Sequence, residues 1–316
     1  SRLVDTLMGM ISLFEIMDDG VIKRDTMKTI DLHTHSTVSD GSYTPAGIAQ
    51  LAKTTGLDAF ALTDHDNIAG CAEAATAAKE VGVDFLPGME RTVDYDGWRL
   101  HIVSLGFDVQ HPAFQALYKK IRDNKESRTD EIIAGIRDRG VAISCELVQQ
   151  HSVGPIDWYA IMRYLVSLHM TEHAQPLWDH YINPVVRELG LSQEITAAEG
   201  LHAIHAAGGV TSLAHFHKKI GLADFSRREQ ETAIADLHQL GLDGMERWYP
   251  TYSAEDAAFA SYMIDKYHLL ATGGTDFHGT NRPGIELGTG WKQNTSIPYT
   301  CYELIQDTLR QRKKSL

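Results

Sequence analysis

Cysteine is scarce in this chain, and the three that occur, Cys71, Cys145 and Cys301, lie far apart without a Cys-x-x-Cys pair. An odd number of widely spaced cysteines supports neither a disulfide framework nor a thiolate zinc site. We therefore expect the thiols to be buried as small apolar groups. We also expect the protein to work in the reducing environment of the cytoplasm.

Long apolar runs and an excess of basic residues are also missing. No stretch of the 316 residues is apolar over the length that spans a bilayer, so we expect no membrane partner. Lys and Arg number 29 against 42 Asp and Glu, which gives a net charge of −13. This balance argues against a nucleic-acid polymer as a stable partner, because clustered cations bind phosphate backbones. It is compatible with a small anionic substrate, since bound divalent cations reverse the charge of a site. The sequence does not indicate an oligomeric state.

Short apolar strands alternate with amphipathic helices after residue 27. The predicted strands cover residues 29–32, 59–62, 83–86, 100–105, 210–214, 243–246 and 269–271. Capping signals mark the helices between them, as in the helix expected to begin after Thr44 with Pro45 and to end at Gly56. This alternation predicts an α/β fold with a parallel sheet.

Three segments depart from this rhythm. Residues 111–194 are rich in aromatic residues and poor in β-branched runs. We interpret them as a helical insertion that caps the open end of the sheet, although they could equally extend the core. Residues 1–27 carry apolar residues at helical spacing and predict an amphipathic helix or an extension without chemistry. Residues 301–316 predict a C-terminal helix with a solvated basic end, which leaves 28–110 and 195–300 for the core.

Histidine and carboxylate side chains recur where the predicted strands end. His33 and His35 follow the first strand, and side chains two apart on an extended chain share a face. Their imidazoles can therefore converge on one ion. The full set of candidate ligands is His33, His35, Asp40, His65, Glu90, His101, His215, Asp276 and His278. Because active sites of parallel barrels are built at the C-terminal ends of the strands, the pattern predicts a barrel and a metal centre together.

Imidazole and carboxylate donors without thiolate suit Zn, Mn or Fe and do not select among them. Nine candidate ligands are too many for one ion, so we expect two or three divalent ions. Asp64 and Asp66 flank His65. These carboxylates could orient the ligating imidazoles, or they could cap the loop; both interpretations stay open.

The motifs that carry these residues resemble those of the polymerase-and-histidinol-phosphatase (PHP) family. The matching segments are Asp31-Leu32-His33-Thr34-His35, Ser39-Asp40-Gly41, Leu62-Thr63-Asp64-His65-Asp66, Pro87-Gly88-Met89-Glu90, Leu213-Ala214-His215 and Gly274-Thr275-Asp276-Phe277-His278-Gly279. They span most of residues 28–290, whereas the insertion resembles the family only loosely. The resemblance implies a distorted seven-stranded (β/α) TIM-like barrel with two or three metal ions.

Carried over position by position, the resemblance also implies ligand sets. It assigns His33, His35, Glu90 and Asp276 to one ion, Asp40, His65 and His278 to a second, and Glu90, His101 and His215 to a third. Asp40 stands where some relatives have His, which leaves the metal preference open. The implied reaction is attack of a metal-bridging hydroxide on phosphorus, with protonation of the leaving oxygen by a nearby acid or by water.

Five further residues are candidates for substrate contact or proton transfer. The four cations lie next to predicted ligands, where they could pair with phosphate oxygens: Lys218, Lys219, Arg91 and Arg282. Each could instead be an ordinary loop cation. His217 could act as general acid or as a strut beside His215. It belongs to the stretch Phe216-His217-Lys218-Lys219, where many relatives have His-Pro-Gly followed by a basic residue, and this departure leaves the exact substrate open.

These patterns predict a metal-dependent phosphoesterase that hydrolyses a small phosphorylated metabolite. The resemblance is closest to nucleoside 3′,5′-bisphosphate phosphatases and cyclic-phosphate dihydrolases. One alternative is a non-catalytic or DNA-polymerase-associated module of the same family, which the acidic charge and the full set of candidate ligands disfavour. Another is a metal-dependent hydrolase of C–N bonds, because metal hydroxide also attacks carbonyl carbon.

Overall fold

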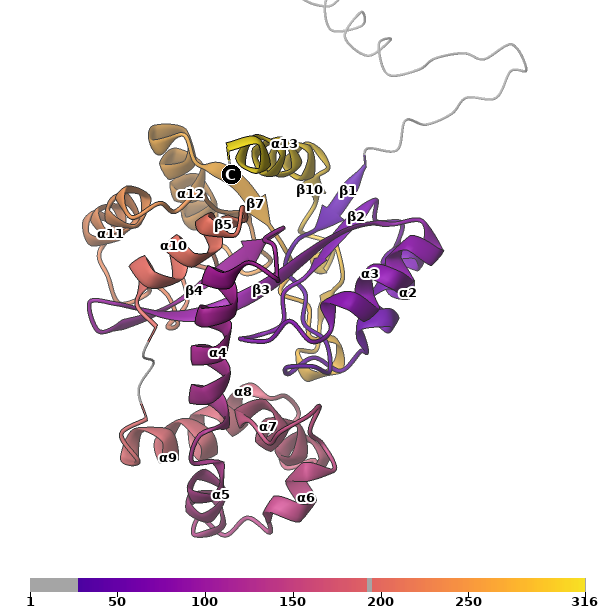
Figure 1. Ribbon diagram of the computed structural model, residues 1–316, viewed down its shortest axis with the longest axis vertical. Helices are drawn as coiled ribbons and strands as arrows, with labels where there is room; N and C mark the ends of the chain where they lie inside the picture. Colours follow the sequence, from indigo (N-terminus) through magenta and orange to yellow (C-terminus); the bar gives the residue numbers. More distant parts are fainter. Residues whose placement is uncertain (1–27, 192–194, 316) are drawn as a thin grey trace, which may run out of the picture.

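A computed structural model describes residues 28–191 and 195–315. The helix or extension predicted over residues 1–27 lies outside these residues. Figure 1 shows a strand-containing barrel above and a helical insertion below, with α4 (Pro112–Glu126) leading from one into the other. Among the described residues, no helix combines the length and the apolar character that crossing a membrane requires.

Seven strands form the barrel wall, and a short eighth strand extends its edge. Their order in the sheet is β10-β1-β2-β3-β4-β5-β6-β7. Their bounds are β1 Thr29–Asp31, β2 Ala59–Leu62, β3 Asp84–Tyr95, β4 Trp98–Leu105, β5 Val210–Leu213, β6 Gly244–Trp248, β7 Leu270–Gly273 and β10 Ile297–Pro298. A hydrogen bond from Leu32 N to Gly273 O (3.1 Å) and a bridge between Thr34 and Phe277 join the ends of β1 and β7. The predicted seven-stranded barrel is therefore confirmed, with β10 added.

The prediction of a parallel sheet is wrong at β4, which runs antiparallel to both β3 and β5, and β10 likewise runs antiparallel to β1. Only Asp96 and Gly97 connect β3 to β4, and both have positive φ (49° and 82°). Two such residues form a type I′ turn, whose twist matches that of a hairpin. As a result β3 extends over 12 residues, well past its predicted end, and Glu90 and His101 lie within the two hairpin strands.

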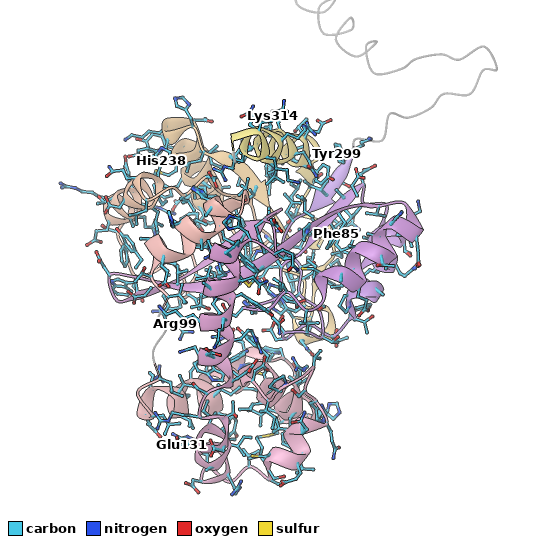
Figure 2. The ribbon with its side chains drawn as sticks, in the orientation of Figure 1. Phe85, Arg99, Glu131, His238, Tyr299 and Lys314 are labelled. Atoms are coloured by element: carbon cyan, nitrogen blue, oxygen red, sulfur yellow. The ribbon has the colours of Figure 1, made fainter. Side chains whose placement is uncertain are left out.

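Helices pack around the barrel, and one closes its end. The surrounding helices are α2 Pro45–Thr55, α3 Cys71–Val81, α10 Ala197–Ala206, α11 Arg227–Gln239 and α12 Ala254–Tyr267. The predicted boundaries of α2 are confirmed, because the Thr44 hydroxyl accepts the Gly47 N–H and Gly56 (φ 79°) ends the helix. Ile305 and Leu309 of α13 (Thr300–Ser315) belong to the apolar cluster that fills the barrel interior. Figure 2 shows Tyr299 and Lys314, at the two ends of this helix, on the side of the molecule away from Glu131 of the insertion.

Every element that the structure describes between Pro112 and Glu188 is helical. After α4 come α5 Thr129–Arg137, α6 Cys145–Gln149, α7 Trp158–Ser167, α8 Gln175–Leu177, the π-helix Trp178–Ile182 and α9 Asn183–Glu188. Ile132, Ile161, Leu165 and Val185 belong to an apolar cluster that this part does not share with the barrel. The insertion thus has a core of its own, and its role as a cap over substrate stays a prediction.

Candidate metal centre

The barrel brings all nine predicted ligand side chains to one end. Seven of them follow β1, β2, β5 or β7, while Glu90 and His101 come from the middle of β3 and β4. The nine residues are His33, His35, Asp40, His65, Glu90, His101, His215, Asp276 and His278. All are buried except His278, which is partly exposed. Their convergence is a finding of the structure, whereas their role as ligands stays a prediction.

A first group of donor atoms comes from His33, His35, Glu90 and Asp276, the set that the resemblance implies for one ion. The Nε2 atoms of His33 and His35 lie 3.1 and 3.2 Å from Glu90 Oε2. The same two atoms lie 3.5 and 3.2 Å from Asp276 Oδ1. Four donors at this spacing could hold one cation.

A second group comes from His35, Asp40, His65 and His278. Asp40 Oδ1 lies 3.2 Å from His278 Nε2, 3.8 Å from His65 Nε2 and 3.9 Å from His35 Nδ1. His35 is an addition to the implied set. Its two ring nitrogens face the first and the second group, so one imidazole connects them.

A third group is centred on Glu90. Its Oε1 lies 2.8 Å from His101 Nδ1 and 2.9 Å from His215 Nε2. Its Oε2 lies 3.1 Å from His65 Nδ1. Glu90 therefore belongs to two groups, and the three groups form one continuous cluster of donors.

Many of these buried atoms have no hydrogen-bond partner. They are His33 Nε2, both ring nitrogens of His35, Asp40 Oδ1, His65 Nδ1, Glu90 Oε2 and His215 Nδ1. A buried polar atom without a partner is costly, and most such atoms in native proteins are satisfied. Because most of these unpartnered donors face one another in a cluster without thiolate, the residues fit divalent cations.

The imidazoles differ in their affinity for protons. Burial disfavours a charged ring, but the neighbouring carboxylates outweigh burial at His35 and raise its pKa to about 9. They also raise the pKa of His33 well above its usual value. At His65 and His215 burial prevails and lowers the pKa to about 3. Without metal, protons on His33 and His35 would balance the buried negative charge.

The carboxylates of the cluster stay ionised at neutral pH. Burial opposes this, but nearby imidazoles hold the pKa of Asp40 and of Glu90 well below the usual values. At Asp276, burial is outweighed by the charges of Lys218 and Arg282, which keep its pKa equally low. All three carboxylates are thus available as anionic ligands.

Asp64 and Asp66 contact backbone and other side chains instead of the ligand rings. Asp64 accepts hydrogen bonds from the backbone N–H of Ser36 (2.7 Å) and the hydroxyls of Ser36 and Ser39 (each 2.6 Å). Asp66 accepts the Thr92 N–H at 3.2 Å. These contacts agree with the loop-capping interpretation of the two carboxylates.

Sequence reasoning assigned no role to Glu246, which the structure places against two predicted ligands. This buried residue of β6 has Oε1 2.6 Å from His33 Nδ1, and its Oε2 accepts the His215 N–H at 2.6 Å. The backbone of His215 has a positive φ of 24°, a conformation that a non-glycine residue adopts only where its surroundings impose it. In the sequence, Glu246 is marked by its place at the end of a predicted strand.

A cationic side of the cluster lies at Asp276. Its Oδ2 accepts hydrogen bonds from Arg282 (2.6 Å), from Lys218 Nζ (3.1 Å) and from the hydroxyl of Tyr249 (2.6 Å). Lys218 and Arg282 remain partly exposed, with 30% and 23% of their side-chain surface accessible. Of the predicted substrate-binding cations, Lys218 and Arg282 therefore stand beside the donor cluster with access to solvent, and Tyr249 contacts the same carboxylate.

The prediction that Arg91 contacts substrate is corrected by the structure. Side chains alternate along β3, so Arg91 points to the opposite face from Glu90. Its Nε donates to Ser104 Oγ at 3.0 Å, and its guanidinium packs against Gly200 of α10. It is fully buried between barrel and helix. No substrate at the donor cluster can reach it there.

The structure also argues against His217 as general acid. Its ring packs against Tyr249 and Tyr252, and Nε2 lies 2.8 Å from the Thr251 hydroxyl. Burial, together with the charge of Lys218, lowers the pKa of His217 to about 4. A neutral imidazole does not carry the proton that a general acid must donate near pH 7. We therefore treat His217 as a packing residue.

The insertion contacts the loops that carry His65 and Asp40. The ring of Tyr159 in α7 stacks on His65 with centroids 5.7 Å apart. Lys125 Nζ pairs with Asp66 at 3.0 Å, and Arg163 donates to the carbonyl oxygen of Ser39 at 2.6 Å. The insertion thus helps to position the second group.

Known proteins resemble this chain over most of its length. The PHP domain model matches residues 31–136. A 3′,5′-nucleoside bisphosphate phosphatase of Chromobacterium violaceum is 31% identical over 83% of this chain and 91% of its own length. A 5′-3′ exoribonuclease of Haemophilus influenzae is 30% identical over 79% and 90%. Among solved structures, a candidate metal-dependent phosphoesterase of Bifidobacterium adolescentis has a TM-score of 0.77 at 23% identity, covering 89% of this chain and 96% of that one.

Proposed function

The chain belongs to the PHP family of metal-dependent phosphoesterases, and from that premise we propose that it hydrolyses small phosphorylated metabolites. Nucleoside 3′,5′-bisphosphates and cyclic sugar or nucleotide phosphates are the substrates to test first. The net charge of −13 favours a small substrate over a nucleic-acid polymer. An insertion docked beside the donor cluster also favours a substrate that fits within a limited space.

We propose that the donor cluster holds two or three divalent ions, with Mn, Zn and Fe as candidates. The first group would bind one ion, Asp40, His65 and His278 a second, and Glu90, His101 and His215 a third. Bound divalent cations supply Lewis acidity, which lowers the pKa of water and neutralises charge on a phosphate. One observation carries this proposal: both oxygens of Glu90 lie within 3.2 Å of imidazole nitrogens from different strands.

The residues around Asp276 would recognise the phosphate. Because Asp276 faces the first group through Oδ1 and the cations through Oδ2, a phosphate beside it would meet both. Lys218 and Arg282 would pair with the phosphate oxygens, while the Tyr249 hydroxyl keeps Asp276 oriented. Bound divalent cations would neutralise further charge on the same anion.

A panel of phosphate esters and amides, run side by side with protein loaded with Mn, Zn or Fe, tests the proposed function. We expect metal-dependent release of inorganic phosphate from at least one small monoester, or ring opening of a cyclic phosphate. Asp276→Asn should abolish turnover while the circular dichroism spectrum stays unchanged. Turnover of amides alone would favour the C–N hydrolase. No turnover in any metal form, with tight binding of primed DNA, would favour the polymerase-associated module.

A further inference from the structure

We propose that Glu246 is a positioning residue that holds two predicted ligands of different donor groups with one carboxylate. The inference rests on the proposed metal centre and adds a residue to it. Glu246 ends the buried part of β6, which runs parallel between β5 and β7. From there its side chain reaches both the segment after β1 and the segment after β5.

The first contact fixes the ring of His33. Glu246 Oε1 lies 2.6 Å from His33 Nδ1, and both side chains are almost completely buried. A carboxylate at this distance selects the tautomer that carries its proton on Nδ1. The lone pair of Nε2 then points toward Glu90 and Asp276, where the first ion would lie. A carboxylate partner also increases the basicity of a ligating imidazole.

The second contact fixes the backbone of His215. Glu246 Oε2 accepts its N–H at 2.6 Å, at a residue whose φ of 24° is rarely adopted by a side-chain-bearing residue. A charge-assisted hydrogen bond of this length is among the stronger ones in proteins and can hold such a conformation. The conformation directs His215 Nε2 to Glu90 Oε1. One carboxylate therefore aims a ligand of the first group and a ligand of the third.

The role of Glu246 differs from that of a carboxylate that only supports loops. Asp31 is equally buried, but it accepts hydrogen bonds from the backbone of His33, Thr275 and Gly288 and from the Thr275 hydroxyl. It contacts no ligand ring. Glu246 makes no contact with Asp40, His65 or His278, so its influence should be confined to two of the three groups.

The variant Glu246→Gln tests this, with Glu255→Gln on the exposed face of α12 as matched control. Glutamine keeps the shape, but its single amide oxygen cannot accept both the His33 Nδ1–H and the His215 N–H. Stepwise Zn²⁺ affinities would be measured by competition with a chelator, and folding by circular dichroism. We expect ions bound through His33 and His215 to be held 10- to 100-fold more weakly. One ion should keep its affinity, and Glu255→Gln should match the unmodified protein.

A second comparison separates positioning from a general structural effect. In a His33→Ala background the ring that Glu246 orients is gone, so Glu246→Gln should weaken the first ion by less than about 2-fold. If Glu246→Gln does not fold, Glu246→Asp takes its place. Aspartate keeps the negative charge, but its side chain is one methylene shorter and holds the carboxylate farther from His33 and His215. Unchanged stepwise affinities, or equal loss of every ion, would overturn the inference while leaving the metal centre intact. An unmodified protein that binds no Zn²⁺ would overturn the centre and the inference together.

Discussion

At the scale of single residues, two carboxylates of the centre use their two oxygens for different contacts. Asp276 turns Oδ1 toward imidazoles and Oδ2 toward Lys218 and Arg282. Each carboxylate oxygen of Glu90 contacts a different set of imidazoles. This division packs a high density of charge into a buried space, and it requires positive charge to balance it. Metal ions or protons can supply that charge, so the two compete for the same atoms.

This competition predicts how the stability of chelator-treated protein depends on pH. The pKa of His35 is raised to about 9, so its stabilising effect is complete below its unfolded pKa of about 6.5 and is lost as pH rises through 9. The pKa values of His65 and His215 are lowered to about 3. As pH falls below about 6.5, these imidazoles bind protons in the unfolded chain but not in the folded protein, which favours unfolding. The melting temperature should therefore be highest near pH 6.5. Thermal unfolding between pH 5 and 9 with excess chelator measures it.

Metal-loaded protein is the control for this prediction. Ions that occupy the ring nitrogens replace the protons, so the fall in melting temperature between pH 6.5 and 9 should disappear on loading. A chelator-treated protein whose melting temperature rises steadily up to pH 9 would contradict the account.

The two cations at Asp276 lead to a prediction about substrate affinity. A hydrogen bond to a charged group contributes about 1.5–3 kcal/mol, so Lys218→Ala or Arg282→Ala should lower kcat/KM by roughly 10- to 100-fold. Lys219→Ala is the matched control, because this neighbouring lysine is 84% exposed and pairs with Asp224. Steady-state kinetics on the best substrate of the panel measure the effect. Equal losses at Lys218 and Lys219 would show that Lys218 acts only through general charge.

At the scale of elements, the sequence predicts strands well and their pairing less well. Each predicted strand overlaps an observed one, because apolar runs between helices mark buried strands. The direction of β4 was missed, although Asp96-Gly97 is a typical hairpin pair that could have revealed it. The two residues of β10 carry too little pattern for any prediction. The attachment of the insertion could not be predicted either, because Lys125 and Asp66 meet only in the folded chain.

That attachment predicts a large effect of one buried lysine. Lys125 is 3% exposed, pairs with Asp66 and lies 4.2 Å from the centre of the Trp158 ring. Lys125→Met leaves the Asp66 carboxylate buried without its cation, which should cost about 3–5 kcal/mol of unfolding free energy. Lys119→Met on the same helix removes a lysine that is 75% exposed and should cost less than about 0.5 kcal/mol. Urea unfolding compares them, and similar losses would refute this view of the docking.

At the scale of the whole molecule, the barrel separates an apolar end from a polar one. Ile305 and Leu309 of α13 complete the interior cluster, while most donors of the metal centre follow strand ends and Glu90 and His101 lie within β3 and β4. The sequence predicts which side chains meet there, because polar residues after buried strands must gather at one rim. The sequence does not show that Glu246 contacts His33 and His215, or that the Arg91 side chain points away from the donor cluster. A single polar residue on a strand has no partner in the sequence until the register of the sheet is known.

The number of ions per chain tests the central claim most directly. Protein reconstituted with excess Zn, Mn or Fe and freed of loosely bound metal would be analysed by plasma mass spectrometry, beside Glu90→Gln. We predict two or three ions per chain in the unmodified protein. We predict a loss of at least one in Glu90→Gln, because that carboxylate belongs to two donor groups. Fewer than two ions in the unmodified protein, or an unchanged count in the variant, would contradict the account.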